Sequence, residues 1–197
     1  ERKYMKKAYL VLEDGQAFEG LRFGADIESV GELVFTTGMG GYIETLTDPS
    51  YCGQIIMQTF PLIGNYGIIE EDFEGVCRAR GYVVREVCDT PSNFRAQYDL
   101  DTFLKKQGIA GLCGIDTRRL TRIIRERGVM NATICDSIPS DMSQVKNYRV
   151  ENAVENVTCD AEMIYHAENE NYRVTLIDYG AKRNIIRSLL SRGCSVR

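Results

Sequence analysis

The chain has 197 residues, of which 44% are hydrophobic and 26% are charged, and its formal net charge at pH 7 is −4. This composition is typical of an ordinary soluble protein with enough apolar residues for one domain, or for one domain with an appendage. The acidic balance leaves no basic excess for general polyanion binding, so we expect a protein that does not bind nucleic acid.

Residues 1–7 read ERKYMKK and are followed by only a short apolar run. A signal peptide or a membrane-spanning helix requires a longer apolar stretch than this one. We therefore expect a cytoplasmic protein without membrane contacts.

The seven cysteines form neither a Cys-x-x-Cys pair nor a cluster with the single histidine, His166. Their spacing argues against a zinc site and against a disulfide framework. We expect no bound metal and mostly reduced, packed thiols. The cysteines occupy positions 52, 77, 88, 113, 135, 159 and 194.

The first 150 residues predict a β-rich domain. The apolar runs 8–13 and 16–23 flank Asp14-Gly15, and an Asp-Gly pair between two such runs is typical of a β-hairpin. Further strands are predicted over residues 32–37, 54–60, 81–87, 109–113 and 132–135.

Two predicted helices interrupt these strands. Asp99 or Asp101 is expected to cap a helix that ends near Gly108, and Asp116 is expected to cap a helix over residues 117–127 that ends at the following glycine. The mixture of strands and helices predicts an α+β fold. The apolar face of the second helix consists of Leu120, Ile123 and Ile124.

Residues 38–50 lie between two predicted strands and are dense in Gly, Thr, Asp, Pro and Ser. Such a loop permits unusual backbone angles and presents short polar side chains, so it can hold a small polar ligand. Gly38-Met39-Gly40-Gly41 is not a phosphate loop, because no Lys-Ser/Thr follows it and no clear helix is predicted behind it. We expect no ATP site in this chain.

From residue 137 to residue 171 the sequence becomes rich in Asn, Glu, Asp and Ser, which predicts a linker with a short helix. A strand over residues 173–178, a helix that ends at Gly193 and a next strand from residue 194 follow. One such unit cannot bury its own faces, so we interpret it as the severed start of a second, parallel α/β domain. The predicted division of the chain is 1–150, 151–171 and 172–197.

Four motifs of the chain follow the order of a known family. They lie at residues 31–67, which contain LTDPSY, at Ser92-Asn93-Phe94-Arg95, at 114–122 (GIDTRRLTR) and at 178–185 (DYGAKRNI). Together they resemble the small subunit of glutamine-dependent carbamoyl-phosphate synthetase. The resemblance implies a three-layer, β/β/α-type N-terminal domain, followed at residues 172–197 by the first βα unit of a truncated class I glutamine amidotransferase domain.

In the complete subunit of this family, a Cys nucleophile with a His base and an orienting Glu hydrolyses glutamine, and the ammonia passes to a large subunit. There it combines with bicarbonate and ATP to give carbamoyl phosphate for pyrimidine or arginine synthesis. All three catalytic residues are expected beyond residue 197, so this chain by itself should be inert. No cofactor is expected here, since ATP and Mg²⁺ belong to the large subunit.

The resemblance assigns Ser50, the serine of LTDPSY, to glutamine binding. Without it, a turn serine that bonds its own backbone after Pro49 is the simpler interpretation. Arginines of the 117–127 helix become candidates for contact with the large subunit, and a solvated helix face is the alternative. These arginines are Arg118, Arg119, Arg122 and Arg125.

Other features admit a second interpretation. Cys113 partly imitates a Gly-x-Cys-x-Gly nucleophile elbow and, with His166, would make an independent thiol hydrolase, but a packed thiol and a solvated imidazole are simpler. The acidic run at residues 70–74 could attract a cation, although a solvated loop is expected. A non-catalytic binding or scaffolding module with the same fold is the alternative to the amidotransferase role.

Overall fold

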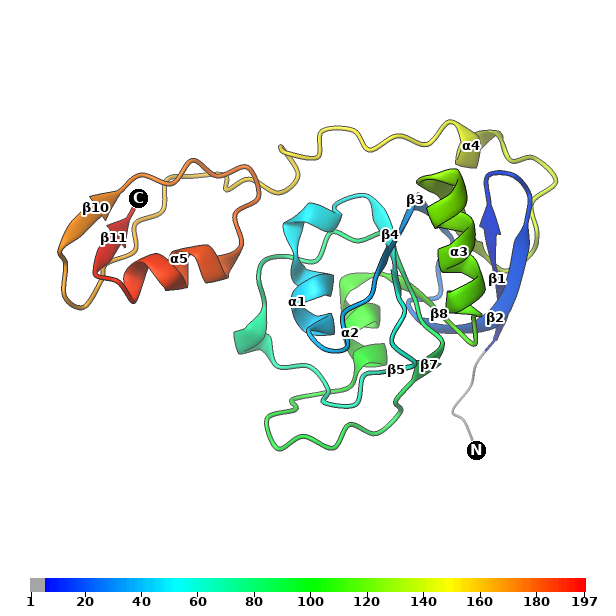
Figure 1. Cartoon of the computed structure of the whole chain (residues 1–197), viewed down its shortest axis with the longest axis horizontal. Coiled ribbons are helices and arrows are strands. Elements are labelled where there is room, and N and C mark those ends of the chain that lie inside the picture. The colour runs from blue at the N-terminus through cyan, green and yellow to red at the C-terminus, as the bar shows by residue number, and fades with distance from the viewer. Residues whose placement is uncertain (1–5) are drawn as a thin grey trace.

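Seven strands close into a barrel in the computed structural model, which describes residues 6–197 (Figure 1). Because short helices fill the connections between strands, the fold is a mixed α and β one. Residues 1–5 of the charged N-terminus lie outside the described residues. In order around the barrel, the strands are β1 (Lys7–Leu12), β2 (Ala17–Gly24), β8 (Ala110–Cys113), β6 (Gly81–Val83), β4 (Gln54–Gln58), β3 (Ser29–Thr36) and β9 (Met130–Cys135).

β1 and β2 form the predicted hairpin around Asp14-Gly15. They pair antiparallel, with Leu10 opposite Phe18. The Gly15 N–H donates to the Leu12 carbonyl at 2.8 Å, and Gly15 has a φ of +88°. Glycine adopts a φ of this sign at little cost, which explains the Asp-Gly pair in the turn.

β3 with β4, β4 with β6, and β6 with β8 run parallel, and the other neighbours in the barrel run antiparallel. Parallel neighbours need long crossover connections. The motifs at residues 46–51 and 92–95 therefore lie in crossovers. These connections hold α1 (Tyr42–Thr47) and the 3₁₀ helix η1 (Pro49–Tyr51), then β5 (Leu62–Ile63) and the 3₁₀ helix η2 (Glu70–Asp72), then β7 (Glu86–Val87) and α2 (Leu100–Gln107).

Successive side chains of a strand point to opposite faces of the sheet, so the buried apolar residues form two clusters. One cluster draws residues from all seven barrel strands, including Ile55 and Met57 of β4, and is the barrel interior. Ile56, between them, belongs to the second cluster, which α1 and α2 cover from outside. The helix α3 (Thr117–Arg127) adds Leu120 and Ile124 to the interior cluster, as its apolar spacing predicts.

The predicted caps are present at both helices. Asp99, rather than Asp101, caps α2, and this helix ends at Gly108 in the left-handed conformation. Asp101 instead accepts the N–H of Gly24 at 2.6 Å and ties α2 to β2. α3 begins at the predicted cap and ends at the predicted glycine.

Some predicted strands are longer than those observed. The run 81–87 is broken, because β7 leaves the barrel and pairs with β5. The run 54–60 ends at Gln58. The apolar pattern continues across both breaks, so it does not locate where the chain changes partner.

The glycine-rich stretch predicted to be a loop contains α1. Gly41, with a φ of +75°, precedes this helix, and the Tyr66 hydroxyl accepts the N–H groups of Gly41 and Tyr42 at 2.9 and 3.0 Å. The cap comes from a distant part of the chain, so no local signal marks the helix start. The prediction that no helix follows the glycines is therefore wrong.

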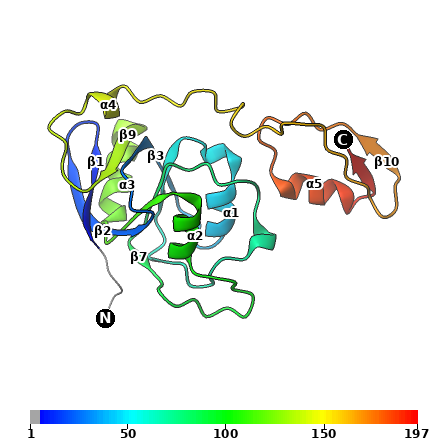
Figure 2. The ribbon, with the colours of Figure 1, turned by 180° about the vertical axis from the view of Figure 1, so that it is seen from behind.

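A second unit comprises β10 (Tyr172–Val174), α5 (Arg183–Leu190) and β11 (Cys194–Val196). β10 and β11 run parallel, so the predicted strand–helix–strand order is present, although the first strand ends before residue 178. Figures 1 and 2 show this unit, in orange and red, beside the barrel, joined to it by an extended connection that carries α4 (Ser143–Lys146). Tyr165 of the connection forms an antiparallel bridge with Val196.

Replacing Asp116 with Ala should lower the free energy of unfolding by about 1 kcal/mol, because its carboxylate accepts the Arg119 N–H at 3.0 Å and caps α3. Asp116→Asn keeps the acceptor and should retain most of the stability. Urea denaturation followed by circular dichroism measures both variants. Equal losses in the two variants would show that the charge, and not the hydrogen bond, stabilises the helix start.

Candidate functional site

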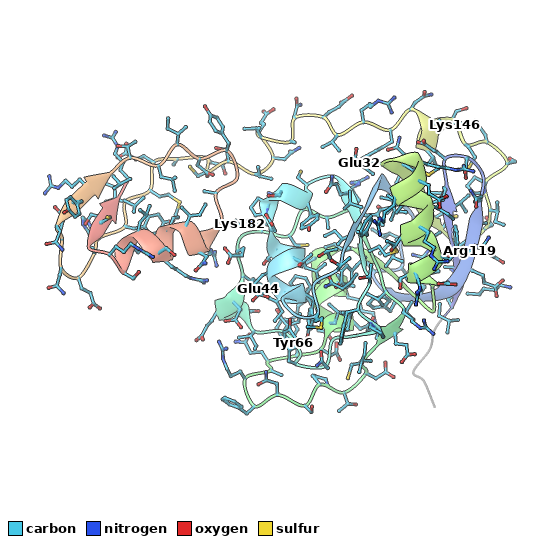
Figure 3. The ribbon with its side chains drawn as sticks, viewed as in Figure 1. Glu32, Glu44, Tyr66, Arg119, Lys146 and Lys182 are labelled. Carbon is cyan, nitrogen blue, oxygen red and sulfur yellow. The ribbon has the colours of Figure 1, made fainter. Side chains whose placement is uncertain are left out.

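The LTDPSY loop, residues 46–51, meets the second unit through Asp48. One carboxylate oxygen of Asp48 accepts the Ser50 N–H at 2.9 Å, and the other contacts the Lys182 ammonium at 2.7 Å. The Asp48 residue is only 8% exposed. Figure 3 shows Lys182 on the side of the second unit that faces the barrel. A single buried carboxylate thus shapes the loop and binds the start of α5.

The hydrogen bond to Asp48 raises the pKa of Lys182, against an opposing effect of partial burial. The ammonium therefore stays charged at neutral pH. Because Asp48 is buried, its charge requires this partner.

Glu74 caps α5 from the barrel side. Its backbone carbonyl accepts the Arg183 N–H at 2.9 Å, and its carboxylate accepts the Asn184 N–H at 2.9 Å. No side chain of the helix's own N-cap residue, Lys182, performs this role. The Glu74 N–H also donates to the Thr47 hydroxyl at 2.9 Å, so Glu74 joins the LTDPSY loop to the second unit.

Asp178 organises the turn before α5. Its carboxylate accepts the N–H groups of Gly180, Ala181 and Cys159 at 2.7 to 2.8 Å. Burial raises the pKa of Asp178, but the backbone N–H groups outweigh burial and hold the pKa below its ordinary value. The connection and the turn are therefore locked together around an ionised carboxylate.

Gly180 permits close contact between the two units. It has a φ of +97°, and a Cβ atom there would lie 2.7 Å from a Val157 methyl and 3.2 Å from the Pro49 Cβ. A side chain would be strained by the backbone angle and would also push the turn away from the loop. The DYGAKRNI motif thus needs glycine at this position.

Ser50, the predicted glutamine-binding residue, lies in η1 with an exposed side chain. Its N–H donates to Asp48, and its hydroxyl forms no hydrogen bond with any residue in the 6–197 range. The preceding Pro49 lines a hollow of about 540 Å³ between the two units, together with Glu74, Asp178 and Arg183. Ser50 itself does not line this hollow, and its side chain is exposed beside it.

The four predicted interface arginines do not all lie in one place. Arg118, Arg122 and Arg125 line a common hollow of about 510 Å³, to which the β6–β7 connection adds Arg85. Arg119, labelled in Figure 3, lies instead over the Phe18 ring, at 5.4 Å from its centroid. Arg85 was not predicted from the sequence. It lies between β6 and β7, and no sequence pattern indicates that this connection contacts α3.

Cys113 and His166 are not brought together. Cys113 lies in β8, 2% exposed, in the outer apolar cluster. His166 is exposed and lines a surface hollow with Leu190 and Ser191 of the second unit. These placements fit the packed thiol and the solvated imidazole.

The acidic run 70–74 is used in contacts with other residues. Glu70 accepts the Tyr98 hydroxyl at 2.7 Å, and Arg95 pairs with the next two carboxylates at 3.3 and 3.0 Å. In residues 6–197, no group of three or more His, Cys, Asp or Glu side chains is placed to hold a metal ion. Over the same range, no helix has both the length and the apolar character needed to cross a membrane.

Lys182 and Glu74 were not predicted as site residues. Lys182 belongs to the DYGAKRNI motif, so its position in a motif was the available signal. Glu74 belongs to the acidic run, and only the docking of α5 distinguishes it from its neighbours.

The family model described as carbamoyl-phosphate synthase small chain, CPSase domain, matches residues 10–134. The chain is 46% identical over 196 residues to the carbamoyl phosphate synthase pyrimidine-specific small chain of Halalkalibacterium halodurans, and 46% identical over 194 residues to the carbamoyl phosphate synthase small chain of Bacillus anthracis. The chain therefore belongs to the carbamoyl-phosphate synthase small chain family.

Each of these two matches covers 96% of this chain and 53% of the relative, so the chain spans about half the length of the curated relatives it matches. Among solved structures, the aminopeptidase from Aneurinibacillus sp. strain AM-1 aligns over 67% of this chain and 32% of that chain. The identity is 16% and the TM-score is 0.38, a likeness too low to support any argument.

Replacing Glu74 with Ala should speed hydrogen exchange at the Asn184 amide by about 5-fold or more, since an uncapped helix start loses on the order of 1 kcal/mol. Glu70→Ala is the matched control, because Glu70 belongs to the same acidic run but contacts Tyr98 rather than α5. Equal protection of Asn184 in both variants would contradict the cap.

The turn before α5 should loosen in acid because of Asp178. Its folded-state pKa lies below the unfolded value, so its stabilising contribution is present at neutral pH and is lost as the pH falls through the folded pKa. The amide resonances of Gly180 and Ala181 should report this titration by NMR. Asp178→Asn should abolish it, and an unchanged titration in that variant would assign the effect to another group.

Proposed function

We propose that this chain is the N-terminal part of a small subunit that, when complete, hydrolyses glutamine and passes the ammonia to a large subunit for ATP-dependent carbamoyl phosphate synthesis. In this proposal residues 1–150 form the three-layer N-terminal domain, residues 151–171 the linker, and residues 172–197 the start of a class I glutamine amidotransferase domain. The parallel pairing of β10 and β11 around α5 supports the last assignment.

The observation that carries the proposal is the junction of two family motifs. LTDPSY and DYGAKRNI lie far apart in the sequence, and the Asp48–Lys182 contact joins them in space. Ser50 belongs to this loop and has an exposed hydroxyl, which can donate to a carboxylate or accept from an ammonium group. Free glutamine carries both groups on its α-carbon, so Ser50 is proposed to bind that end of the substrate.

The rest of the activity is assigned to the remainder of the small subunit and to the large subunit. The catalytic Cys, His and Glu would come from the rest of the small subunit, and ATP with Mg²⁺ would bind the large subunit. Residues 1–197 alone would then be inert, in a cytoplasmic heterodimer. The product would serve pyrimidine or arginine synthesis, and the name of one relative is pyrimidine-specific.

Ser50→Ala, made in the complete small subunit, should weaken glutamine use by about 1–3 kcal/mol, the scale of an unpaired polar partner. Because the lost contact is distant from the reacting amide, the Michaelis constant for glutamine should rise more than the maximal rate falls. Steady-state assays with the large subunit measure both constants.

Ammonia supplied directly bypasses the glutamine pocket, so it provides the control. Ammonia-dependent carbamoyl phosphate synthesis should be nearly unchanged in Ser50→Ala. An equal loss with ammonia and with glutamine would place Ser50 in folding or in the subunit interface, and the substrate-binding assignment would be wrong.

A further inference from the structure

One face of the barrel domain concentrates positive charge. Arg118, Arg122 and Arg125 follow one another on α3 at spacings of four and three, so they share one side of the helix. Arg85 reaches the same hollow from the β6–β7 connection. All four residues are exposed.

None of these four guanidinium groups has an ion-pair partner or a side-chain hydrogen bond within residues 6–197. Three other arginines of the barrel domain are paired with carboxylates. Arg22 contacts Asp136 at 2.8 Å, Arg95 contacts Asp72 at 3.0 Å, and Arg127, at the end of α3, pairs with Asp14. Among the described residues, no carboxylate lines the hollow, and its other lining residues are Thr37, Thr59, Pro61, Thr117 and Thr121.

This unneutralised cluster belongs to a chain whose net charge is −4. Like charges at helical spacings of three and four destabilise a helix, and no ion pair within residues 6–197 offsets this repulsion. Charge complementarity therefore points to an external group of negative charge.

The geometry favours an extended acidic segment over a small anion. A site for one small oxyanion brings its donors to a single point, with buried groups or backbone N–H groups around it. Here four long, exposed side chains surround an open hollow of about 510 Å³. Guanidinium groups in that arrangement suit several carboxylates at once, each held by paired hydrogen bonds.

We propose that Arg85, Arg118, Arg122 and Arg125 form a docking surface for an acidic, carboxylate-bearing segment of a partner protein. The inference rests on the proposed function in taking that partner to be the large subunit. Arg119 lies outside the surface, because its guanidinium covers the Phe18 ring.

The test compares two charge reversals on the same helix. In the complete small subunit, Arg122→Glu should weaken association with the large subunit by at least about 10-fold, and Arg85→Glu should act in the same direction from a different element. Arg119→Glu should change the dissociation constant less than about 2-fold. Isothermal titration calorimetry at low and moderate salt measures the constants, and the wild type should lose more affinity with salt than Arg122→Glu does.

Separate measurements check that each variant folds. Circular dichroism and the thermal midpoint should be alike in the three reversed variants, and Arg122→Lys should recover part of the affinity because it keeps the charge. Wild-type affinity in both Arg85→Glu and Arg122→Glu would overturn the docking surface and leave the proposed function intact. Failure of the wild-type subunits to associate would overturn both.

A separate titration tests whether the four arginines bind a small anion instead of an acidic segment. Inorganic phosphate, titrated at constant ionic strength into the complete small subunit, should bind no more tightly to the wild type than to Arg122→Glu. Phosphate binding that disappears in Arg122→Glu, with subunit association unchanged, would replace the acidic segment by a free anion and overturn the proposal.

Discussion

The packing of the second unit against the barrel depends on the Asp48 carboxylate, which contacts Lys182. A carboxylate buried to this degree is unfavourable unless both oxygens have partners. One partner is the Ser50 N–H inside the same loop, and the other is Lys182 of the second unit. The conformation of the LTDPSY loop and the docking of α5 are therefore parts of one interaction, so a change in either affects the other.

The barrel topology places the remaining contacts around Asp48. Parallel neighbours in the barrel require crossovers, and two successive crossovers carry the LTDPSY loop and the acidic run. The bond between Glu74 and the Thr47 hydroxyl fastens these crossovers to each other. Glu74 then offers its carbonyl and carboxylate to α5, whose own N-terminal residues supply no cap. The barrel therefore completes a helix that belongs to the second unit.

The acidic run and the arginines on the outer face of α3 have different uses in this molecule. The carboxylates of the acidic run hold internal contacts, with Tyr98, with Arg95 and with the start of α5. The arginines on the outer face of α3 have no such contacts in the described part of the chain, apart from Arg127 at its end. The first set stabilises the fold, whereas the second set leaves a surface whose charge is unbalanced.

The features that depend on near neighbours in the chain could be predicted from the amino-acid pattern alone. The hairpin at Asp14-Gly15, the capped α3 and the strand–helix–strand order of the second unit follow from turn chemistry, caps and periodicity within a few residues. The motifs identified the family. Three other outcomes appear only in the folded molecule: Tyr66 caps α1, Lys182 meets the LTDPSY loop, and Arg119 separates from its neighbours. Each of these outcomes depends on a partner distant in the sequence, and local patterns carry no record of such a partner.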